Sequence, residues 1–159
     1  MLTPSTKARK LINAFSSKIV KNKVQGSLHV IDLQSIREIS QKCGLSLRKV
    51  EILALEAGLV PKHYQRNLNS MSIADQLSLL KAEIVVLGIG GLGGYILEML
   101  CRVGVGRIFI VDGDVFEETN LNRQLMANEK NLGHNKACVA KNRMADVNSC
   151  VEVEAIAKF

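Results

Sequence analysis

Five glycines within seven residues, followed by a helix-like stretch and an aspartate, constrain the fold more than any other feature. The segment reads LGIGGLGGYILEMLCRVGVGRIFIVDGD and runs from Leu87 to Asp114. The preceding run EIVVLG, residues 83–88, is apolar and β-branched, which predicts a buried parallel strand. After the glycines, apolar residues recur at helical spacing until Gly104, and a second apolar run ends at Asp112. About thirty residues of strand, helix and strand form a βαβ unit, which predicts a parallel sheet.

The glycines fit the pattern G-x-G-x-x-G, in which a strand turns sharply into a helix. The matching positions are Gly88, Gly90, Gly91 and Gly93. Such a loop lets a phosphate approach bare backbone, and the free N–H groups at the helix start favour an anion. Asp112 follows Gly93 by 19 residues, where it can accept hydrogen bonds from a ribose diol. The unit predicts a site for ribose and phosphate, and by itself it does not distinguish NAD from ATP.

Charge divides the chain into two parts. Residues 1–66 carry 12 Lys and Arg against 4 Asp and Glu, whereas residues 67–159 carry 9 against 11. The net charge of +6 therefore comes from the N-terminal part. We expect a basic helical module at residues 1–62 and the domain with the glycine loop at residues 63–159.

The start of the basic module is predicted to be helical. The stretch from Lys7 to Lys23 contains no acidic residue, and its apolar residues recur at helical spacing. It could be a basic arm for nucleic acid or for a membrane surface. The favoured interpretation is a helix docked by its apolar face, with solvated lysines outside. On this interpretation neither nucleic acid nor a membrane is expected as a partner.

Two further helices are predicted in the same module, which we therefore expect to be all helical. Asp32 and Ser46 can cap helices that end near Lys42 and Ala57. The pair has the outline of a DNA-binding helix-turn-helix, but Glu51 on the second helix would face phosphates unfavourably. Four apolar residues are expected to face each other across this pair: Ile36, Ile39, Val50 and Leu53.

The stretch that follows the βαβ unit gives the chain a specific resemblance. The segments GIGGLGGYILEMLCRVGVGRIFIVDGDVFEETNLNRQ and LGHNKA resemble the adenylation domain of the ThiF/MoeB/HesA family, relatives of the ubiquitin-activating enzymes. YQRN at Tyr64–Asn67 resembles the family's YxRQ motif, with Asn67 where the motif has Gln. The match extends to about Ile156. It implies an α/β fold with a Rossmann-like parallel sheet and flanking helices, truncated here after about the third strand.

The resemblance implies an adenylyltransferase that uses ATP and Mg²⁺. Family members adenylate the C-terminal carboxylate of a ubiquitin-like sulfur-carrier protein, as in thiamine or molybdopterin synthesis. Because the carboxylate attacks the α-phosphate and pyrophosphate leaves, negative charge on the phosphate oxygens must be neutralised. Arg123 and Lys136, 13 residues apart, supply cations from two elements. Their matching positions in the family contact ATP phosphates, and Asp112 matches the ribose ligand.

Several other residues acquire roles from the same resemblance. Asn120 and Gln124 match polar positions that line the site, and Arg66 matches an arginine that reaches into the neighbouring subunit's site, which implies a homodimer. Asp114 is expected either to assist at the ribose or a metal, or to cap its loop. The family's magnesium-binding aspartate, zinc-binding cysteines and thiol acceptor are expected beyond residue 159. We therefore assign no metal ligand and expect residues 1–159 alone to be inactive.

Composition limits the alternatives. The four cysteines are far apart without a CxxC pair, which argues against a zinc site or disulfide framework and for a reducing cytosol. No apolar run reaches the roughly 18 residues that span a bilayer, and no signal peptide is visible, so a cytoplasmic location is expected. Three alternative functions stay open: activation of another carboxylate, such as one on a modified tRNA, a NAD-dependent dehydrogenase, and a non-catalytic nucleotide-binding or DNA-associated adapter.

Overall fold

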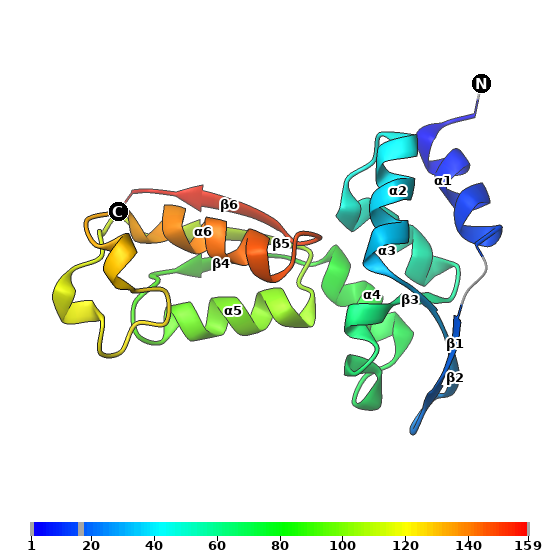
Figure 1. The fold of residues 1–159 in the computed structure, drawn as a ribbon, viewed down its shortest axis with the longest axis horizontal. Coiled ribbons are helices and arrows are strands. Elements are labelled where there is room, and N and C mark those ends of the chain that lie inside the picture. Colours follow the sequence, from blue (N-terminus) through cyan, green and yellow to red (C-terminus); the bar gives the residue numbers. More distant parts are fainter. Residues whose placement is uncertain (1, 16–17, 159) are drawn as a thin grey trace. The chain divides into compact units, whose positions relative to one another are not determined.

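The computed structural model describes residues 2–15 and 18–158, and the chain packs as two compact units (Figure 1). The first unit is Met1–Lys81 and the second is Ala82–Phe159. Residues 63–81 pack with the first unit. The predicted domain boundary after residue 62 stays a prediction, because packing units and domains need not coincide.

The first unit combines helices with a three-stranded sheet of order β1-β2-β3. β1 pairs antiparallel with β2, and β2 pairs parallel with β3. The elements of this unit are α1 (Pro4–Asn13), β1 (Lys18–Asn22), β2 (Gly26–Ile31), α2 (Leu33–Cys43), α3 (Leu47–Glu56), β3 (Leu59–Pro61), the 3₁₀ turns η1 (Lys62–Tyr64) and η2 (Asn67–Asn69), and α4 (Ile73–Lys81).

The expectation of an all-helical first module is wrong. The predicted helix from Lys7 to Lys23 ends at Asn13, and the chain then forms the β1–β2 hairpin. Ser16 and Ser17, part of the same prediction, lie outside the described residues. The hairpin is favoured locally because the side chain of Asn22 accepts the backbone N–H groups of Val24 and Gln25, which closes the turn.

The predicted helix pair is confirmed as α2 and α3. Asp32 and Ser46 cap the two helices through hydrogen bonds to Ser35 N and Lys49 N, and Gly44 ends α2 in the left-handed conformation. The four apolar residues expected to face each other all belong to one core cluster: Ile36, Ile39, Val50 and Leu53.

The second of these helices, α3, lies between two core clusters of the first unit. Val50, Leu53 and Ala54 belong to the cluster shared with α1 and α2, whereas Ile52 and Leu55 belong to the cluster shared with β2 and α4. All residues from Val50 to Leu55 are buried. A helix buried on two sides cannot enter a DNA groove, so the fold does not support a DNA-reading role for α3.

The second unit is a parallel sheet of order β4-β5-β6 with crossover helices, as predicted for a Rossmann-like fold. Because consecutive strands are neighbours, both crossovers place their helices on one face. Alternate residues of β5, Ile108 and Ile110, are fully buried. The elements are β4 (Glu83–Leu87), α5 (Gly93–Val103), β5 (Arg107–Val111), the turns η3 (Glu118–Asn120) and η4 (Glu129–Asn131), α6 (Lys136–Val147) and β6 (Glu152–Ile156).

An ion-pair cluster joins the two crossover helices. Glu98 of α5 accepts hydrogen bonds from Arg102 on the same helix and from Arg143 of α6. These hydrogen bonds hold the pKa of Glu98 below its usual value of 4.5, and the bond from Arg143 has the largest effect. The cluster therefore stabilises the helix layer when Glu98 is ionised.

The expectation that the first strand of the βαβ unit is buried is wrong for one of its faces. Val85 and Leu87 are 59% and 77% exposed, because α5 and α6 cover only the opposite face of the sheet. Within the described residues, no helix combines the length and apolar character needed to cross a membrane.

Candidate active site

The glycine loop is held so tightly that one of its positions excludes any side chain. Gly88 has a φ of +79° and donates its N–H to Val111 O at 2.9 Å, which joins the end of β4 to β5. At Gly93, where α5 begins, a β-carbon would lie 1.8 Å from the carbonyl oxygen of Gly88. A β-carbon at Gly90 would meet nothing within 4 Å. The backbone of Gly88 therefore packs directly against Gly93, whereas the backbone of Gly90 is not covered by other atoms.

The side chain of Asp112 anchors this loop through hydrogen bonds. It is 8% exposed, and its Oδ2 accepts the N–H of Ile89 at 2.6 Å. Its Oδ1 accepts the N–H of Asp114 at 2.9 Å, so one carboxylate joins the glycine loop to the segment after β5. Each oxygen keeps further acceptor capacity, and the predicted hydrogen bonds to a ribose diol stay compatible with this arrangement.

Lys136 and Asp114 form an ion pair at the start of α6. The Nζ of Lys136 lies 3.0 Å from Asp114 Oδ2, and the lysine side chain is only 8% exposed. Asn135 orients this pair: it caps α6 by accepting the N–H of Cys138, and its Nδ2 donates to the backbone oxygens of Asp112 and Asp114. Asp114 thus pairs with a cation, an arrangement that the sequence did not reveal.

The segment NLNRQ supplies the other predicted residues. Arg123 is exposed and donates from Nη1 to Thr119 O at 2.6 Å and to Asn122 Oδ1 at 3.0 Å. Asn120 is buried and accepts the N–H of Glu117 through Oδ1. Gln124 is buried, and its Oε1 has no hydrogen-bond partner among the described residues. An unpaired buried oxygen beside a cleft fits a site that receives a polar ligand.

These residues surround one cleft of about 540 Å³, which we call the glycine-loop cleft. Gly90 lies at its edge, and the β-carbon position of Gly91 lies 3.9 Å from Arg123 Cγ. Six of the lining residues were predicted from the sequence: Gly90, Asp114, Asn120, Arg123, Gln124 and Lys136. Sequence reasoning missed Val115, Glu117 and Thr119, which line the same cleft, and Asn135. Asn135 could have been predicted as the N-cap of α6, since asparagine is favoured immediately before a helix.

Arg66 does not belong to this group in the described structure. It lies in the first unit between η1 and η2, whereas the glycine-loop cleft is formed by the second unit. The neighbouring Asn67, which replaces the Gln of the resembling motif, donates from Nδ2 to Gln76 Oε1 at 2.9 Å. The predicted role of Arg66 in a partner subunit's site stays a prediction.

Comparison with known proteins places the chain in a family. The ThiF family profile matches residues 64–159. The chain belongs to the ThiF family. This confirms the resemblance and the α/β fold with a Rossmann-like parallel sheet.

Two curated relatives share this region with the chain. The tRNA threonylcarbamoyladenosine dehydratase of Bacillus subtilis is 42% identical over 98 residues, which are 60% of this chain and 39% of the relative. The sulfur carrier protein adenylyltransferase of Thermus thermophilus is 40% identical over 93 residues, which are 58% of this chain and 34% of the relative. The chain thus spans between a third and two-fifths of the length of these relatives.

Solved structures share the fold as well. The tRNA N6-threonylcarbamoyladenosine dehydratase of E. coli, in complex with ATP, matches with a TM-score of 0.55 and 33% identity, over 60% of this chain and 38% of that one. E. coli MccB in complex with MccA-N7isoASN matches with a TM-score of 0.59 and 34% identity, over 62% of this chain and 30% of that one.

Proposed function

We propose that this protein is an adenylyltransferase that uses ATP to convert a carboxylate into an acyl adenylate. The observation that carries the proposal is the glycine-loop cleft itself. Open backbone at Gly90 and two cations from different elements, Arg123 and Lys136, line one cleft. ATP in the related E. coli dehydratase supports the choice of nucleotide.

In the proposed reaction a carboxylate oxygen attacks the α-phosphorus. A new C–O–P linkage forms, the bond between the α-phosphorus and its bridging oxygen breaks, and pyrophosphate leaves with that electron pair. Arg123 and Lys136 neutralise negative charge on the phosphate oxygens, and the backbone N–H groups at the start of α5 bind phosphate. Each oxygen of Asp112 accepts one backbone N–H and can accept a further hydrogen bond, here from a ribose hydroxyl.

The carboxylates beside the loop do not fit a magnesium centre. Asp114 is paired with Lys136, and both oxygens of Asp112 accept backbone N–H groups. A cation already paired to Asp114 competes with a metal for the same oxygens. We therefore assign no step to Mg²⁺ at these residues.

The preferred acceptor is the C-terminal carboxylate of a ubiquitin-like sulfur-carrier protein, supported by the Thermus relative. A second candidate is a carboxylate on a modified tRNA, supported by the Bacillus relative and by its E. coli counterpart. Both acceptors require the same adenylation chemistry at the glycine-loop cleft. They differ in the surface that must hold the acceptor.

Exchange of labelled pyrophosphate into ATP tests the proposal. We expect the full-length protein to catalyse exchange only when the correct acceptor is added, with purified sulfur carriers and threonylcarbamoyladenosine-containing tRNA tested separately. Calorimetry should give binding of ATP and little binding of NAD. Tighter binding of NAD would favour a dehydrogenase, and ATP binding without exchange for any acceptor would favour a non-catalytic adapter.

Arg66 is proposed to act in the site of a second copy of the chain. If it does, mixing inactive Arg66→Ala protein with inactive Asp112→Ala protein should restore activity, since a mixed dimer holds one site with both residues intact. Subunit exchange should be verified by mass in the same mixture. No recovery after proven exchange would place Arg66 outside the partner's site.

A further inference from the structure

The first unit contains a second cleft, of about 460 Å³, which we call the basic cleft. Five of its lining residues are basic or can become so, and none is acidic. They are Lys21, Lys23, Lys62, His63 and Arg66. The remaining lining residues carry amides: Asn22, Gln65 and Asn69. Four of the twelve Lys and Arg residues of the N-terminal part therefore line one concave surface.

The walls of the basic cleft are tied together by hydrogen bonds. Asn22, at the end of β1, donates from Nδ2 to Asn69 Oδ1 at 3.1 Å. Gln25, in the hairpin turn, donates from Nε2 to Met71 O at 3.1 Å. These bonds hold the β1–β2 hairpin against the segment that contains η1 and η2. The two walls of the cleft are thus bonded to each other, and its lysines lie on both walls.

Most of the cations are available to a ligand. Lys21, Lys23 and Arg66 are exposed and make no ion pair with a described residue. Lys62 lies close enough to Asp32 to help lower the pKa of that carboxyl, although hydrogen bonds from Ser35 lower it most. These charges are not neutralised inside the cleft, so an anion can replace water around them.

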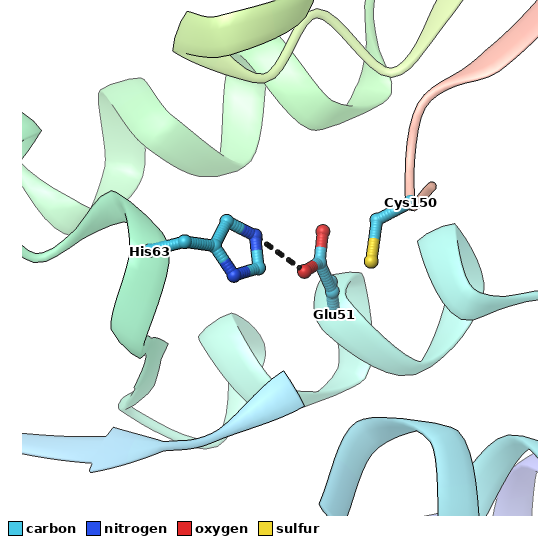
Figure 2. Close-up of side chains that lie close together, drawn as sticks. All are labelled: Glu51, His63 and Cys150. Atoms are coloured by element: carbon cyan, nitrogen blue, oxygen red, sulfur yellow. Dashed lines mark ion pairs between the residues drawn. The ribbon is translucent and has the colours of Figure 1, made fainter. Parts of the chain in front are cut away.

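A buried carboxylate contacts one of the cleft residues. Nε2 of His63 lies 2.9 Å from Oε1 of Glu51, which is fully buried (Figure 2). Cys150, also drawn there, belongs to the second unit. This contact holds the ring of His63 at the cleft wall, where 32% of its side chain is exposed.

The shape and chemistry of the cleft select among polyanions. A membrane surface is flat and contacts protruding basic residues, whereas these lysines flank a concavity. The major groove of a DNA duplex admits a helix or a two-stranded β-ribbon. However, α3 is buried on both sides, and the lysines of the β1–β2 hairpin line a concavity. A single strand can enter a concave site, where cations contact phosphates, amides bond to base edges and sugars, and a histidine ring stacks on a base.

We propose that the basic cleft binds an unpaired segment of RNA through its phosphodiester backbone. Lys21 and Lys23 contact phosphates from the hairpin wall, and Lys62 does so from the opposite wall. This revises the expectation that nucleic acid is not a partner, because the cations gather on a concave surface and not along a docked helix. The inference goes beyond adenylation and does not depend on it, since the three lysines lie outside the glycine-loop cleft. Arg66, which the proposed function places in the site of a second copy, is left unchanged in the test.

The experiment measures binding of a fluorescein-labelled oligouridylate of about 12 nucleotides to the full-length protein by anisotropy, over a range of salt concentrations. The test variant carries Lys21→Gln, Lys23→Gln and Lys62→Gln together. For single strands, each lost phosphate contact lowers the slope of log K against log salt by about 0.7, so three contacts lower it by about 2. At low salt we expect affinity to fall roughly tenfold or more.

A matched control removes three exposed lysines outside the cleft: Lys10, Lys42 and Lys49, each replaced by Gln. It should keep the slope of the unaltered protein, as should a variant with Arg at positions 21, 23 and 62. Thermal unfolding verifies that all variants fold. An unchanged slope in the test variant, or an equal loss in the control, would overturn the proposal. Equal binding of duplex DNA, or binding of phosphatidylserine vesicles and not of RNA, would overturn the choice of ligand.

Pyrophosphate exchange, measured on the same variants with a sulfur carrier, separates this inference from the proposed function. We expect the triple Gln variant to keep exchange while it loses RNA binding. Loss of both activities in a folded variant would overturn the independence of the two clefts. If instead the unaltered protein exchanges only with tRNA, the triple variant should raise the KM for tRNA and leave kcat unchanged.

Discussion

In the glycine-loop cleft both cations already have partners, whereas in the basic cleft the lysines of the hairpin make no ion pair with a described residue. Lys136 is bonded to Asp114, and Arg123 to the backbone oxygen of Thr119. Lys21 and Lys23 extend from β1 and its turn without such contacts. A cation held by its own chain has a fixed position before the ligand arrives, which suits a reaction with strict geometry. Long unpaired side chains adapt to a strand of variable shape, which suits binding through charge.

The largest expected effect tests the fixed cations. Arg123→Ala should lower the rate of pyrophosphate exchange about a hundredfold, or about 3 kcal/mol, because Arg123 would stabilise charge that grows in the transition state. Lys130→Ala, on the nearby η4 turn, is the matched control and should change little. The rate is measured with saturating acceptor, alongside the unfolding temperature. Exchange at the unaltered rate in a folded Arg123→Ala protein would contradict the comparison.

The glycine loop offers a pair of Gly→Ala variants that lie three residues apart in the same loop. Gly93→Ala should lower the free energy of unfolding by about 2 kcal/mol or more, because its β-carbon would collide with the Gly88 carbonyl. Gly90→Ala meets nothing within 4 Å, so stability should change by less than about 0.5 kcal/mol, while ATP binding weakens because a methyl group covers open backbone. Urea unfolding and calorimetry measure the two effects. Similar stability for both variants would show that the loop can open at Gly93.

A smaller effect is expected at Asn135. Asn135→Ala should lower the free energy of unfolding by about 1 kcal/mol, the usual contribution of a helix N-cap. Asn135→Ser keeps the cap and removes the two amide bonds to the oxygens of Asp112 and Asp114. Serine should therefore restore stability more fully than ATP affinity. Equal recovery of both would mean that Asn135 only caps α6.

The smallest effect concerns the helix layer of the second unit. Because hydrogen bonds from Arg143 and Arg102 lower the pKa of Glu98 in the folded state, the unfolded state binds more protons at acidic pH. The stability from this cluster is present above the unfolded pKa and is lost as pH falls through the lower folded pKa. Glu98→Gln should flatten the decline of stability between about pH 6 and about pH 3 in urea titrations. A parallel decline in both proteins would contradict the shift.

Local signals predicted much of the second unit and part of the first. The glycine pattern, the β-branched runs and the caps at Asp32 and Ser46 depend on neighbours in sequence, and all appear in the fold. The hairpin after Asn13 was missed because β1 has only five residues and is rich in lysine, so its apolar residues also fit a helical spacing. Its pairing with β2 and β3 depends on long-range contacts that periodicity does not record.

The candidate site was predicted as a set of residues and not as a set of contacts. Asp112, Arg123 and Lys136 were identified from motif spacing, and the structure places all three at or beneath the glycine-loop cleft. The ion pair between Lys136 and Asp114 was missed, since it joins residues 22 apart in sequence. The basic cleft was missed for the same reason: its cations come from two segments that only the fold brings together.

The burial of α3 between two core clusters has a consequence for how the first unit unfolds. If α3 detached, both core clusters would be exposed. We therefore expect the two clusters of the first unit to unfold together. Backbone amides of Val50 to Leu55 should then exchange with solvent deuterium only when the whole unit unfolds, while those of the β1–β2 turn exchange by local opening. The lysines at the turn could thus change conformation on binding a ligand while the core of the first unit stays folded.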